Sequence, residues 1–366
     1  MKPLLLFLVT EDWAFLSHRL PMAKAAQEAG YDVAVACRVR EKQAEIEQLG
    51  YTVYPLAWRR SGNSVFSHLW AIWQIFVLYC RLKPKVIHHV ALKAILFGMI
   101  AGFFSRAHIV NGFTGLGFAF SQTTRKAKII KFGVLCVLQV LLLRGRVRHI
   151  FQNQDDQHTL RLYKNAVIIP GSGIDCQYFT PNRTGDARTR VMMVARALKD
   201  KGTFEFFEAA RLLKSQGVEA DFVFVGEPDH DNPNALSVSE WQRVKDEKNV
   251  DCWGQRTDVR ECWWQCDIAV LPSYREGLPK SLLEAAACGK AIITTHVPGC
   301  QDMVQDGKNG FLVEAKNVEQ LAAAIQTLLT SIDKVEAMGK VSRQRALSEW
   351  STDVIQEKMK TIYRRY

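Results

Sequence analysis

The sequence of 366 residues lacks several features that indicate particular classes of protein. Its nine cysteines include no Cys-x-x-Cys pair, and Cys252, Cys262 and Cys266 do not have the spacing of a zinc ribbon. We therefore expect reduced structural thiols and no metal site. No low-complexity tract or internal repeat is present, and 48% hydrophobic with 23% charged residues is ordinary for a globular protein.

A long uninterrupted hydrophobic run is also absent. A membrane-spanning helix needs about 20 apolar residues, and the two most apolar segments, 65–80 and 132–143, are shorter. The N-terminal run 4–9 follows Pro3, is followed at once by acidic residues, and has no small-residue cleavage site after it. A buried first strand explains this run better than a signal peptide. We therefore expect a cytoplasmic protein.

Acidic residues are scarce in the first half of the chain. Residues 1–170 contain 22 Lys and Arg against nine Asp and Glu, whereas residues 171–366 contain 26 against 28. The net charge of +11 therefore comes from the first half. Such an excess suits nucleic acid or an anionic membrane surface. Because aromatic residues are not interleaved with the basic ones, we expect no nucleic-acid partner.

One apolar segment in this basic half has positive charge at both ends. The segment 132–143 is nearly continuous Val, Leu and Cys. Its basic flanks, the candidate membrane contacts, include Arg125, Lys126, Lys128 and Lys131 before it and Arg144, Arg146 and Arg148 after it. Basic ends around an apolar helix are typical of an interfacial helix on anionic lipid. An ordinary buried helix with solvated ends gives the same pattern, so both interpretations stay open.

Short apolar runs alternate with longer helical patterns along the whole chain. The runs predicted to be strands are residues 4–9, 33–36, 86–90, 109–110, 150–153, 167–170, 191–194, 221–225, 268–271 and 291–294. The alternation predicts βαβ units, and hence an α/β protein with two Rossmann-like domains whose parallel sheets face a central cleft. A turn-rich junction at 171–175 places these domains at 1–170 and 171–346. Residues 347–366 are predicted to form a C-terminal helix that packs back on the body.

Two carboxylates eight residues apart bracket a turn after one predicted strand. Glu276 precedes Gly277, Leu278 and Pro279, and Glu284 follows on a helix that is predicted to start near Pro279. The N-terminus of that helix would aim its free N–H groups at the turn, where a diphosphate fits. Glu284 would then accept hydrogen bonds from ribose or sugar hydroxyls. A solvated surface helix produces the same pair of carboxylates by chance.

A second element supplies positive charge for the same ligand. Arg196 follows the predicted strand 191–194, and Lys201-Gly202 precedes the next helical pattern. The guanidinium offers a planar fork of donors and the ammonium a mobile point charge, and both suit phosphoryl oxygens. Together they are predicted to hold one diphosphate.

These residues carry a resemblance to a known family. Arg196, Lys201-Gly202 and the segment 272–284, with the Val-Pro-Gly-Cys of 297–300 and the Asp-Gly-Lys-Asn-Gly of 306–310, resemble the retaining glycosyltransferases of family four. The similarity covers most of the chain and is strongest at 190–315. Segments 15–19 and 111–117 resemble the branch that transfers sugars to lipid-linked acceptors in bacterial surface-polysaccharide and N-glycan assembly.

The resemblance implies a GT-B fold, no cofactor, no essential metal, and transfer from a nucleotide sugar with retention at the anomeric carbon. The roles carried over by matching positions are diphosphate neutralisation by Arg196 and Lys201, donor-sugar binding by Glu276, backbone contacts from Gly277, Leu278 and Pro279, and ribose binding by Glu284. Glu276, Arg196 and Lys201 would form the catalytic set. We find no Asp-x-Asp run at a plausible site, which is consistent with a metal-free mechanism.

Two departures from the family pattern concern the first domain. Glu11, Asp12 and Trp13 stand where many relatives have a glycine pair, and Thr114 stands near the position of a common histidine. The candidate acceptor contacts near the predicted strand ends are His18, His89, Lys93 and Thr114. Each lone histidine has a structural role as its alternative.

The sequence thus predicts a retaining, metal-independent glycosyltransferase. We expect it to move an N-acetylhexosamine from a UDP-sugar to a polyprenyl-diphosphate-linked saccharide, at the inner face of the cell membrane, with peripheral attachment. The alternatives are a nucleotide-sugar epimerase of similar two-domain architecture and a non-catalytic sugar-nucleotide-binding scaffold. The complete set of Arg196, Lys201, Glu276 and Glu284 disfavours the scaffold.

Overall fold

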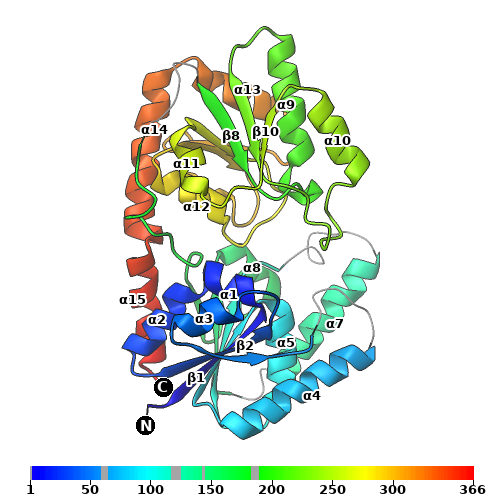
Figure 1. Cartoon of the computed structure of the whole chain (residues 1–366), viewed down its shortest axis with the longest axis vertical. Coiled ribbons are helices and arrows are strands. Elements are labelled where there is room, and N and C mark those ends of the chain that lie inside the picture. The colour runs from blue at the N-terminus through cyan, green and yellow to red at the C-terminus, as the bar shows by residue number, and fades with distance from the viewer. Residues whose placement is uncertain (1, 59–64, 117–124, 142–144, 183–188) are drawn as a thin grey trace. The chain divides into compact units, whose positions relative to one another are not determined.

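The computed structural model describes residues 2–58, 65–116, 125–141, 145–182 and 189–366, apart from the side chains of residues 125–131. The chain divides into two compact units, Met1–Gly173 with Thr352–Tyr366, and Ile174–Ser351. Each unit contains one parallel sheet covered by helices (Figure 1). The α/β class and the two Rossmann-like sheets predicted from the sequence are therefore confirmed.

The sheet of the first unit has seven strands in the order β3-β2-β1-β4-β5-β6-β7, and all neighbours are parallel. The strands are β1 (Leu4–Glu11), β2 (Asp32–Arg38), β3 (Thr52–Pro55), β4 (Val86–Val90), β5 (His108–Phe113), β6 (Val147–Phe151) and β7 (Ala166–Ile168). Alternate residues of β1 enter different cores, Leu6 and Leu8 on one face and Leu5 and Phe7 on the other. Because both faces are buried, the strand reads as an unbroken apolar run.

Helices cover both faces of this sheet (Figure 1). On the face of Leu6 lie α4 (Val65–Leu82), α5 (Leu92–Ala101), α7 (Arg125–Leu141) and α8 (Gln154–Leu160). On the face of Leu5 lie α1 (Asp12–His18), α2 (Leu20–Glu28), α3 (Gln43–Gln48) and α15 (Thr352–Tyr363). The first unit is therefore a three-layer domain closed by the C-terminal helix.

Helix α15 begins five residues later than the predicted start at 347. Residues Ala346–Trp350 instead form a π-helical turn that continues α14 (Ile332–Arg345), and the buried Trp350 holds this turn in the second unit. The C-terminal helix joins the first unit, where Lys360 Nζ lies 2.9 Å from Glu28 Oε2 on α2. The buried Tyr363 places its hydroxyl 2.7 Å from Nδ1 of His88 on β4.

The second unit has six parallel strands in the order β10-β9-β8-β11-β12-β13. The strands are β8 (Arg190–Val194), β9 (Asp221–Val225), β10 (Asp251–Gly254), β11 (Ile268–Leu271), β12 (Ala291–Thr295) and β13 (Gly310–Val313). The helices are α9 (Thr203–Ser215), α10 (Val238–Asp246), α11 (Val259–Trp264), α12 (Lys280–Ala287), α13 (Val318–Leu329) and α14, with short 3-10 turns η2 (Lys199–Lys201) and η3 (Gln301–Met303). The carboxyl ends of β8, β11 and β12 therefore meet at one edge of the sheet.

Three strands, β3, β10 and β13, were not predicted from the sequence. All three lie at sheet edges. In β3 only Val53 is fully buried, and β10 has no fully buried residue. An edge strand has only one neighbour and is partly exposed, so it lacks the continuous apolar run by which central strands are predicted.

Candidate active site

The turn between β11 and α12 carries the first predicted carboxylate and is held in shape by a neighbouring loop. The backbone N–H of Glu276 donates to the carbonyl oxygen of Pro298 at 3.0 Å. Gly299 lies directly against this turn with φ +80°, and a Cβ there would approach the carbonyl oxygen of Glu276 to 2.4 Å. Only glycine tolerates both the positive φ and the close approach. The loop 297–300 therefore fixes the backbone on which Glu276 stands.

An ion pair joins this turn to the segment after β8. The ammonium of Lys201 pairs with Oε1 of Glu276, which also accepts a hydrogen bond of 3.0 Å from the hydroxyl of Ser273. The hydroxyl of Ser273 lies 2.9 Å from the carbonyl oxygen of Asp200. Gly202, at φ +74°, lets the backbone approach Pro272 so closely that a Cβ would lie 2.1 Å from the Pro272 oxygen. The two predicted elements of a diphosphate site therefore lie in contact.

The second predicted cation also has a carboxylate partner. Arg196 follows β8, and its Nη1 lies 2.5 Å from Oδ2 of Asp229. The guanidinium side chain is 43% exposed, and an ion pair this exposed stabilises a protein by about 0–1 kcal/mol. An incoming phosphate can therefore take the place of Asp229 at little cost.

Glu284 differs from Glu276 because it is buried inside α12. Its closest polar neighbours are Nε1 of Trp263 at 3.4 Å from Oε2 and Nζ of Lys280 at 3.9 Å from Oε1. Burial raises the pKa of the Glu284 carboxyl to about 7, against the opposing effects of Lys280 and the Trp263 hydrogen bond. The carboxyl of Glu284 therefore titrates near neutral pH, where proton loss and ligand binding become coupled.

The rest of the predicted turn is covered by protein. Leu278 packs in the hydrophobic core of the second unit, and Gly277 and Pro279 are also buried. Helix α12 begins at Lys280 with Pro279 as its N-cap residue. Any contact of Gly277, Leu278 or Pro279 with a ligand must therefore be made by the backbone.

Three residues at this site were missed in the sequence analysis. Ser273 had a signal, because it is the first hydroxyl after the buried strand β11. Asp229 opens an Asp-His-Asp run with His230 and Asp231, so the expectation that no Asp-x-Asp run lies at a plausible site was wrong. Trp263 reaches Glu284 from α11, which no local pattern shows. Within the described part of the chain, no group of three or more His, Cys, Asp or Glu residues is arranged to hold a metal ion.

The four candidate acceptor contacts of the first unit differ in their exposure to solvent. His89 is fully buried, with Nδ1 2.8 Å from Asn111 Oδ1 and Nε2 3.0 Å from the Tyr79 hydroxyl. Since both ring nitrogens are engaged inside the core, we withdraw His89 as an acceptor contact. His18, Lys93 and Thr114 are partly exposed and remain predictions.

A separate apolar surface lies on the first unit, along α4. Phe66, Trp70 and Trp73 expose 84%, 56% and 54% of their surface, and residues 65–80 include no charged side chain. Among the described residues, α4 is the one helix long and apolar enough to cross a membrane, with 18 residues and a mean hydropathy of 1.3. Its Ala71, Ile75 and Tyr79 are nevertheless buried in the core of the unit.

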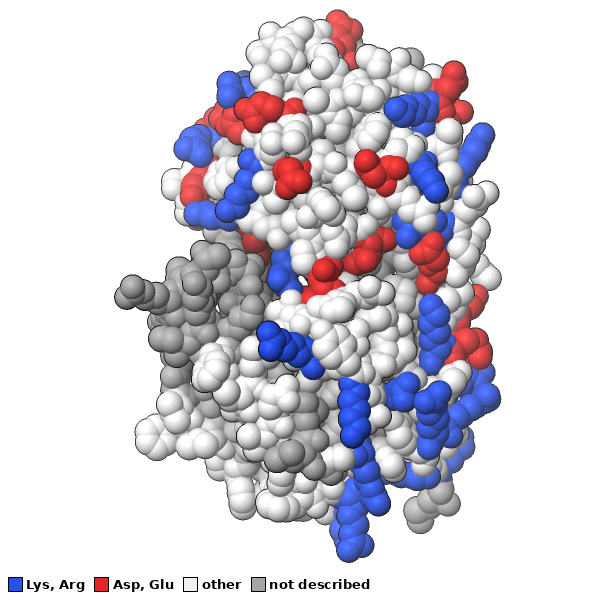
Figure 2. All heavy atoms as spheres, turned by 180° about the vertical axis from the view of Figure 1, so that it is seen from behind, with Lys and Arg blue, Asp and Glu red and all other residues white. Residues whose placement is uncertain are grey.

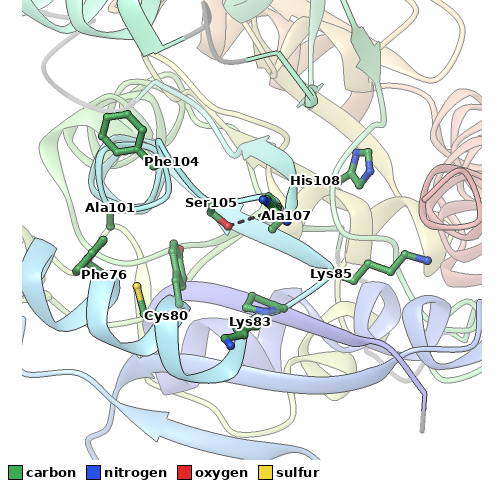
Figure 3. A pocket seen from close by; sticks show the side chains of 12 residues that line it. Phe76, Cys80, Lys83, Lys85, Ala101, Phe104, Ser105, Ala107 and His108 are labelled. Atoms are coloured by element: carbon green, nitrogen blue, oxygen red, sulfur yellow. Dashed lines mark hydrogen bonds between the residues drawn. The ribbon is translucent and has the colours of Figure 1, made fainter.

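A pocket of about 840 Å³ adjoins this helix at the amino-terminal edge of the sheet (Figure 3). Phe76 and Cys80 of α4 line one side, and Ala101 and Phe104 line another. Exposed basic residues contribute to the lining at Lys83, Lys85 and Arg106. Figure 2 shows Lys and Arg gathered over the lower part of the molecule, which the first unit forms, whereas both signs of charge alternate over the upper part. The side chains of the predicted membrane contacts Arg125, Lys126, Lys128 and Lys131 lie outside the described residues.

The chain matches two family models. The model described as glycosyl transferases group 1 matches residues 178–345, and the model described as glycosyl transferase 4-like matches residues 5–154. Among similar proteins, the N,N'-diacetylbacillosaminyl-diphospho-undecaprenol alpha-1,3-N-acetylgalactosaminyltransferase of Campylobacter jejuni is 29% identical, over 96% of this chain and 98% of that enzyme. The UDP-Gal:alpha-D-GlcNAc-diphosphoundecaprenol alpha-1,3-galactosyltransferase of Escherichia coli is 25% identical, over 82% and 80%.

Solved structures show the same architecture. HepE of Anabaena in complex with UDP superposes with a TM-score of 0.77 at 17% identity, over the full length of both chains. Sucrose-phosphate synthase from Thermosynechococcus elongatus gives 0.81 at 18% identity, over 100% of this chain and 99% of that one. The two parallel sheets and these matches define the GT-B class of glycosyltransferases. The chain belongs to the family-four glycosyltransferases, as its sequence predicted.

The buried carboxyl of Glu284 makes stability depend on pH in a predictable direction. Its pKa is about 7 in the folded protein, against an ordinary value of 4.5 for a glutamate, so the folded state binds the proton more tightly. We therefore expect the free energy of unfolding to fall by about 3 kcal/mol as the pH rises from about 5 to above 7. Urea unfolding of wild type and Glu284→Gln at pH 5, 6, 7 and 8 measures this loss, which the variant should not show. The exposed Glu314→Gln is the control, and equal pH profiles for wild type and Glu284→Gln would contradict the assignment.

Proposed function

We propose that the protein transfers an N-acetylhexosamine from a UDP-sugar to a saccharide linked to polyprenyl diphosphate. The observation that carries this proposal is the arrangement of Lys201, Glu276 and Glu284 around the turn between β11 and α12. The enzymes of C. jejuni and E. coli, whose names specify acceptors linked to diphospho-undecaprenol, support the acceptor class. HepE in complex with UDP and with UDP-glucose supports the donor class.

The chemistry at the donor follows from the two ion pairs. A UDP-sugar brings a diphosphate that exchanges with the carboxylates now paired with Arg196 and Lys201. Exchange at Lys201 releases Glu276 to accept hydrogen bonds from hydroxyls of the donor sugar. The bond between the anomeric carbon and the diphosphate oxygen then breaks, the acceptor hydroxyl oxygen bonds to that carbon on the same face, and the hydroxyl proton passes to the departing diphosphate oxygen. The two cations stabilise the charge on the departing diphosphate, so we propose that the reaction needs no metal ion.

Transfer should require both substrates and tolerate a chelator. We expect UDP release only when UDP-N-acetylhexosamine and a polyprenyl-diphosphate-linked saccharide are both present, at a similar rate with EDTA. Chromatography of nucleotide and lipid products measures the reaction, and NMR of the anomeric proton measures retention.

Lys201→Met should lower kcat at least a hundredfold because it removes a cation facing the leaving group. Interconversion of the donor sugar without UDP release would establish the epimerase, and UDP-sugar binding without turnover would establish the scaffold.

Glu284 should couple nucleotide binding to pH. Ribose hydroxyls donate to an ionised carboxylate, so UDP should bind more tightly to the form of Glu284 that has lost its proton. We expect the affinity for UDP, measured by calorimetry, to rise as the pH rises through about 7 and then level off, given the raised pKa. The phosphate of UDP also titrates, so the same titration of Glu284→Gln serves as the reference. Parallel pH profiles for the two proteins would exclude a role of Glu284 in ribose binding.

We also propose that the first unit attaches to an anionic membrane surface through the exposed face of α4. An interfacial position fits better than a membrane span, because Tyr79 of this helix is buried and its hydroxyl lies 3.0 Å from His89 Nε2. Crossing a bilayer would require α4 to leave the sheet. The apolar face would contact acyl chains, and Lys83, Lys85 and Arg106 would contact lipid phosphates.

Removal of the aromatic residues should therefore release the protein from vesicles. We expect the triple change Trp70→Ser, Trp73→Ser and Phe76→Ser to weaken sedimentation with phosphatidylglycerol-containing vesicles at least tenfold, which is about 1.4 kcal/mol. Circular dichroism checks the fold, and neutral phosphatidylcholine vesicles show how much binding depends on charge. Sedimentation equal to wild type would exclude α4 as the contact. The same assay on a variant neutralised at Arg125, Lys126, Lys128 and Lys131 tests the flank of α7.

A further inference from the structure

A second, much smaller pocket lies in the first unit where its strands end. Its lining comes from the carboxyl ends of β5, β6 and β7 and from the start of α2, and includes Arg19, Thr114 and Gln152. The free space is about 10 Å³, which is room for about one water molecule or one phosphate oxygen. Ligands of open parallel sheets bind at this edge. The residues that line this pocket all belong to the first unit, whereas the donor-site residues Arg196, Lys201, Glu276 and Glu284 belong to the second.

The pocket contains a buried positive charge that has no counter-charge among the residues that the structure describes. Arg19 is 5% exposed, and its Nη1 lies 3.1 Å from the sulfur of Met22. Its Nε has no hydrogen-bond partner, and no carboxylate within the described ranges forms a salt bridge with it. Burial lowers the pKa of the guanidinium to about 10, so Arg19 keeps its charge at neutral pH. Buried charges are normally paired, because an unpaired charge is costly to remove from water.

His88 adds a second donor to the same pocket. It is buried in β4, and its one hydrogen bond within the described part of the chain joins Nδ1 to the Tyr363 hydroxyl at 2.7 Å. That hydroxyl is itself fully buried, and burial keeps its pKa well above the ordinary value, so it stays protonated. Since a buried hydroxyl needs an acceptor, Tyr363 donates to Nδ1, which leaves the ring proton on Nε2. Nε2 faces Gly112, where a Cβ would lie 3.0 Å from it.

We propose that Arg19 and His88 bind a phosphate group, and that this group belongs to the diphosphate of the acceptor. The site presents a guanidinium and an imidazole N–H, with Thr114 and Gln152 as further polar lining, and none of the lining residues is acidic. This composition suits an oxygen of a phosphate anion. The identity of the anion rests on the proposed function, in which Arg196 and Lys201 already bind the donor diphosphate. Tyr363 of the C-terminal helix is a positioning residue, because it acts on the anion only through His88.

Inorganic pyrophosphate tests this site without any transfer reaction. We expect pyrophosphate to bind to protein saturated with UDP, because UDP occupies only the donor site, and calorimetry measures this second binding. Arg19→Met should weaken it at least tenfold and leave the affinity for UDP unchanged. Lys24→Met, which removes an exposed cation of α2, should change neither affinity. Loss of pyrophosphate binding in the presence of UDP, or equal affinities for wild type and Arg19→Met, would overturn the proposal.

A second variant keeps the test decisive if Arg19→Met does not fold. Tyr363→Phe retains the guanidinium and the packing of α15 but removes the hydroxyl that fixes the His88 ring. We expect it to weaken pyrophosphate binding several-fold, and an unchanged affinity would overturn the positioning role.

With a lipid-linked acceptor, Arg19→Lys should raise KM for the acceptor several-fold while KM for the donor and kcat stay near wild type. An equal rise in both KM values would indicate a merely structural role. Failure of sugar transfer itself would leave the pyrophosphate result intact, so the two proposals fail separately.

Discussion

Parallel pairing of the strands is the constraint on which both units depend. In a parallel sheet every strand runs in the same direction, so the carboxyl ends of all strands meet at one edge and the loops after them lie together. In the second unit this places the residues after β8 beside the turn after β11, although about 75 positions separate them. In the first unit it gathers the ends of β5, β6 and β7 around Arg19.

Close backbone contacts fix the positions of the loops that follow these strands in the second unit. Gly202 and Gly299 each bring one loop into direct contact with the segment after β11, at positive φ and with no space for a Cβ. Ser273 joins the same segment to the carbonyl oxygen of Asp200 and to Glu276. The carboxylate is therefore held by backbone geometry as well as by Lys201. A site on such a rigid base can exchange ion pairs without rearrangement of the backbone.

The sequence predicted what depends on short-range patterns. Central strands are buried on both faces and so read as apolar runs, and the turn of Glu276 was visible as a Gly-Leu-Pro segment between a predicted strand and a predicted helix. Of the four edge strands, only β7 was predicted, and β3, β10 and β13 were missed. The burial of His89 was also hidden, because its partners Tyr79 and Asn111 come from other elements. Similarly, the pairing of Arg196 with Asp229 depends on strand order, which the local sequence does not contain.

The two units differ in how their cations are balanced, and this difference has a physical consequence. In the second unit Arg196 and Lys201 each have a carboxylate partner, so an incoming diphosphate must displace a charge that is already satisfied. The net gain is then small, which favours release of the nucleotide after reaction. In the first unit, no carboxylate of the described residues forms a salt bridge with Arg19, and its Nε has no hydrogen-bond partner there. An anion at Arg19 would therefore displace no carboxylate, and the attraction of a desolvated guanidinium would hold a phosphate of the proposed acceptor.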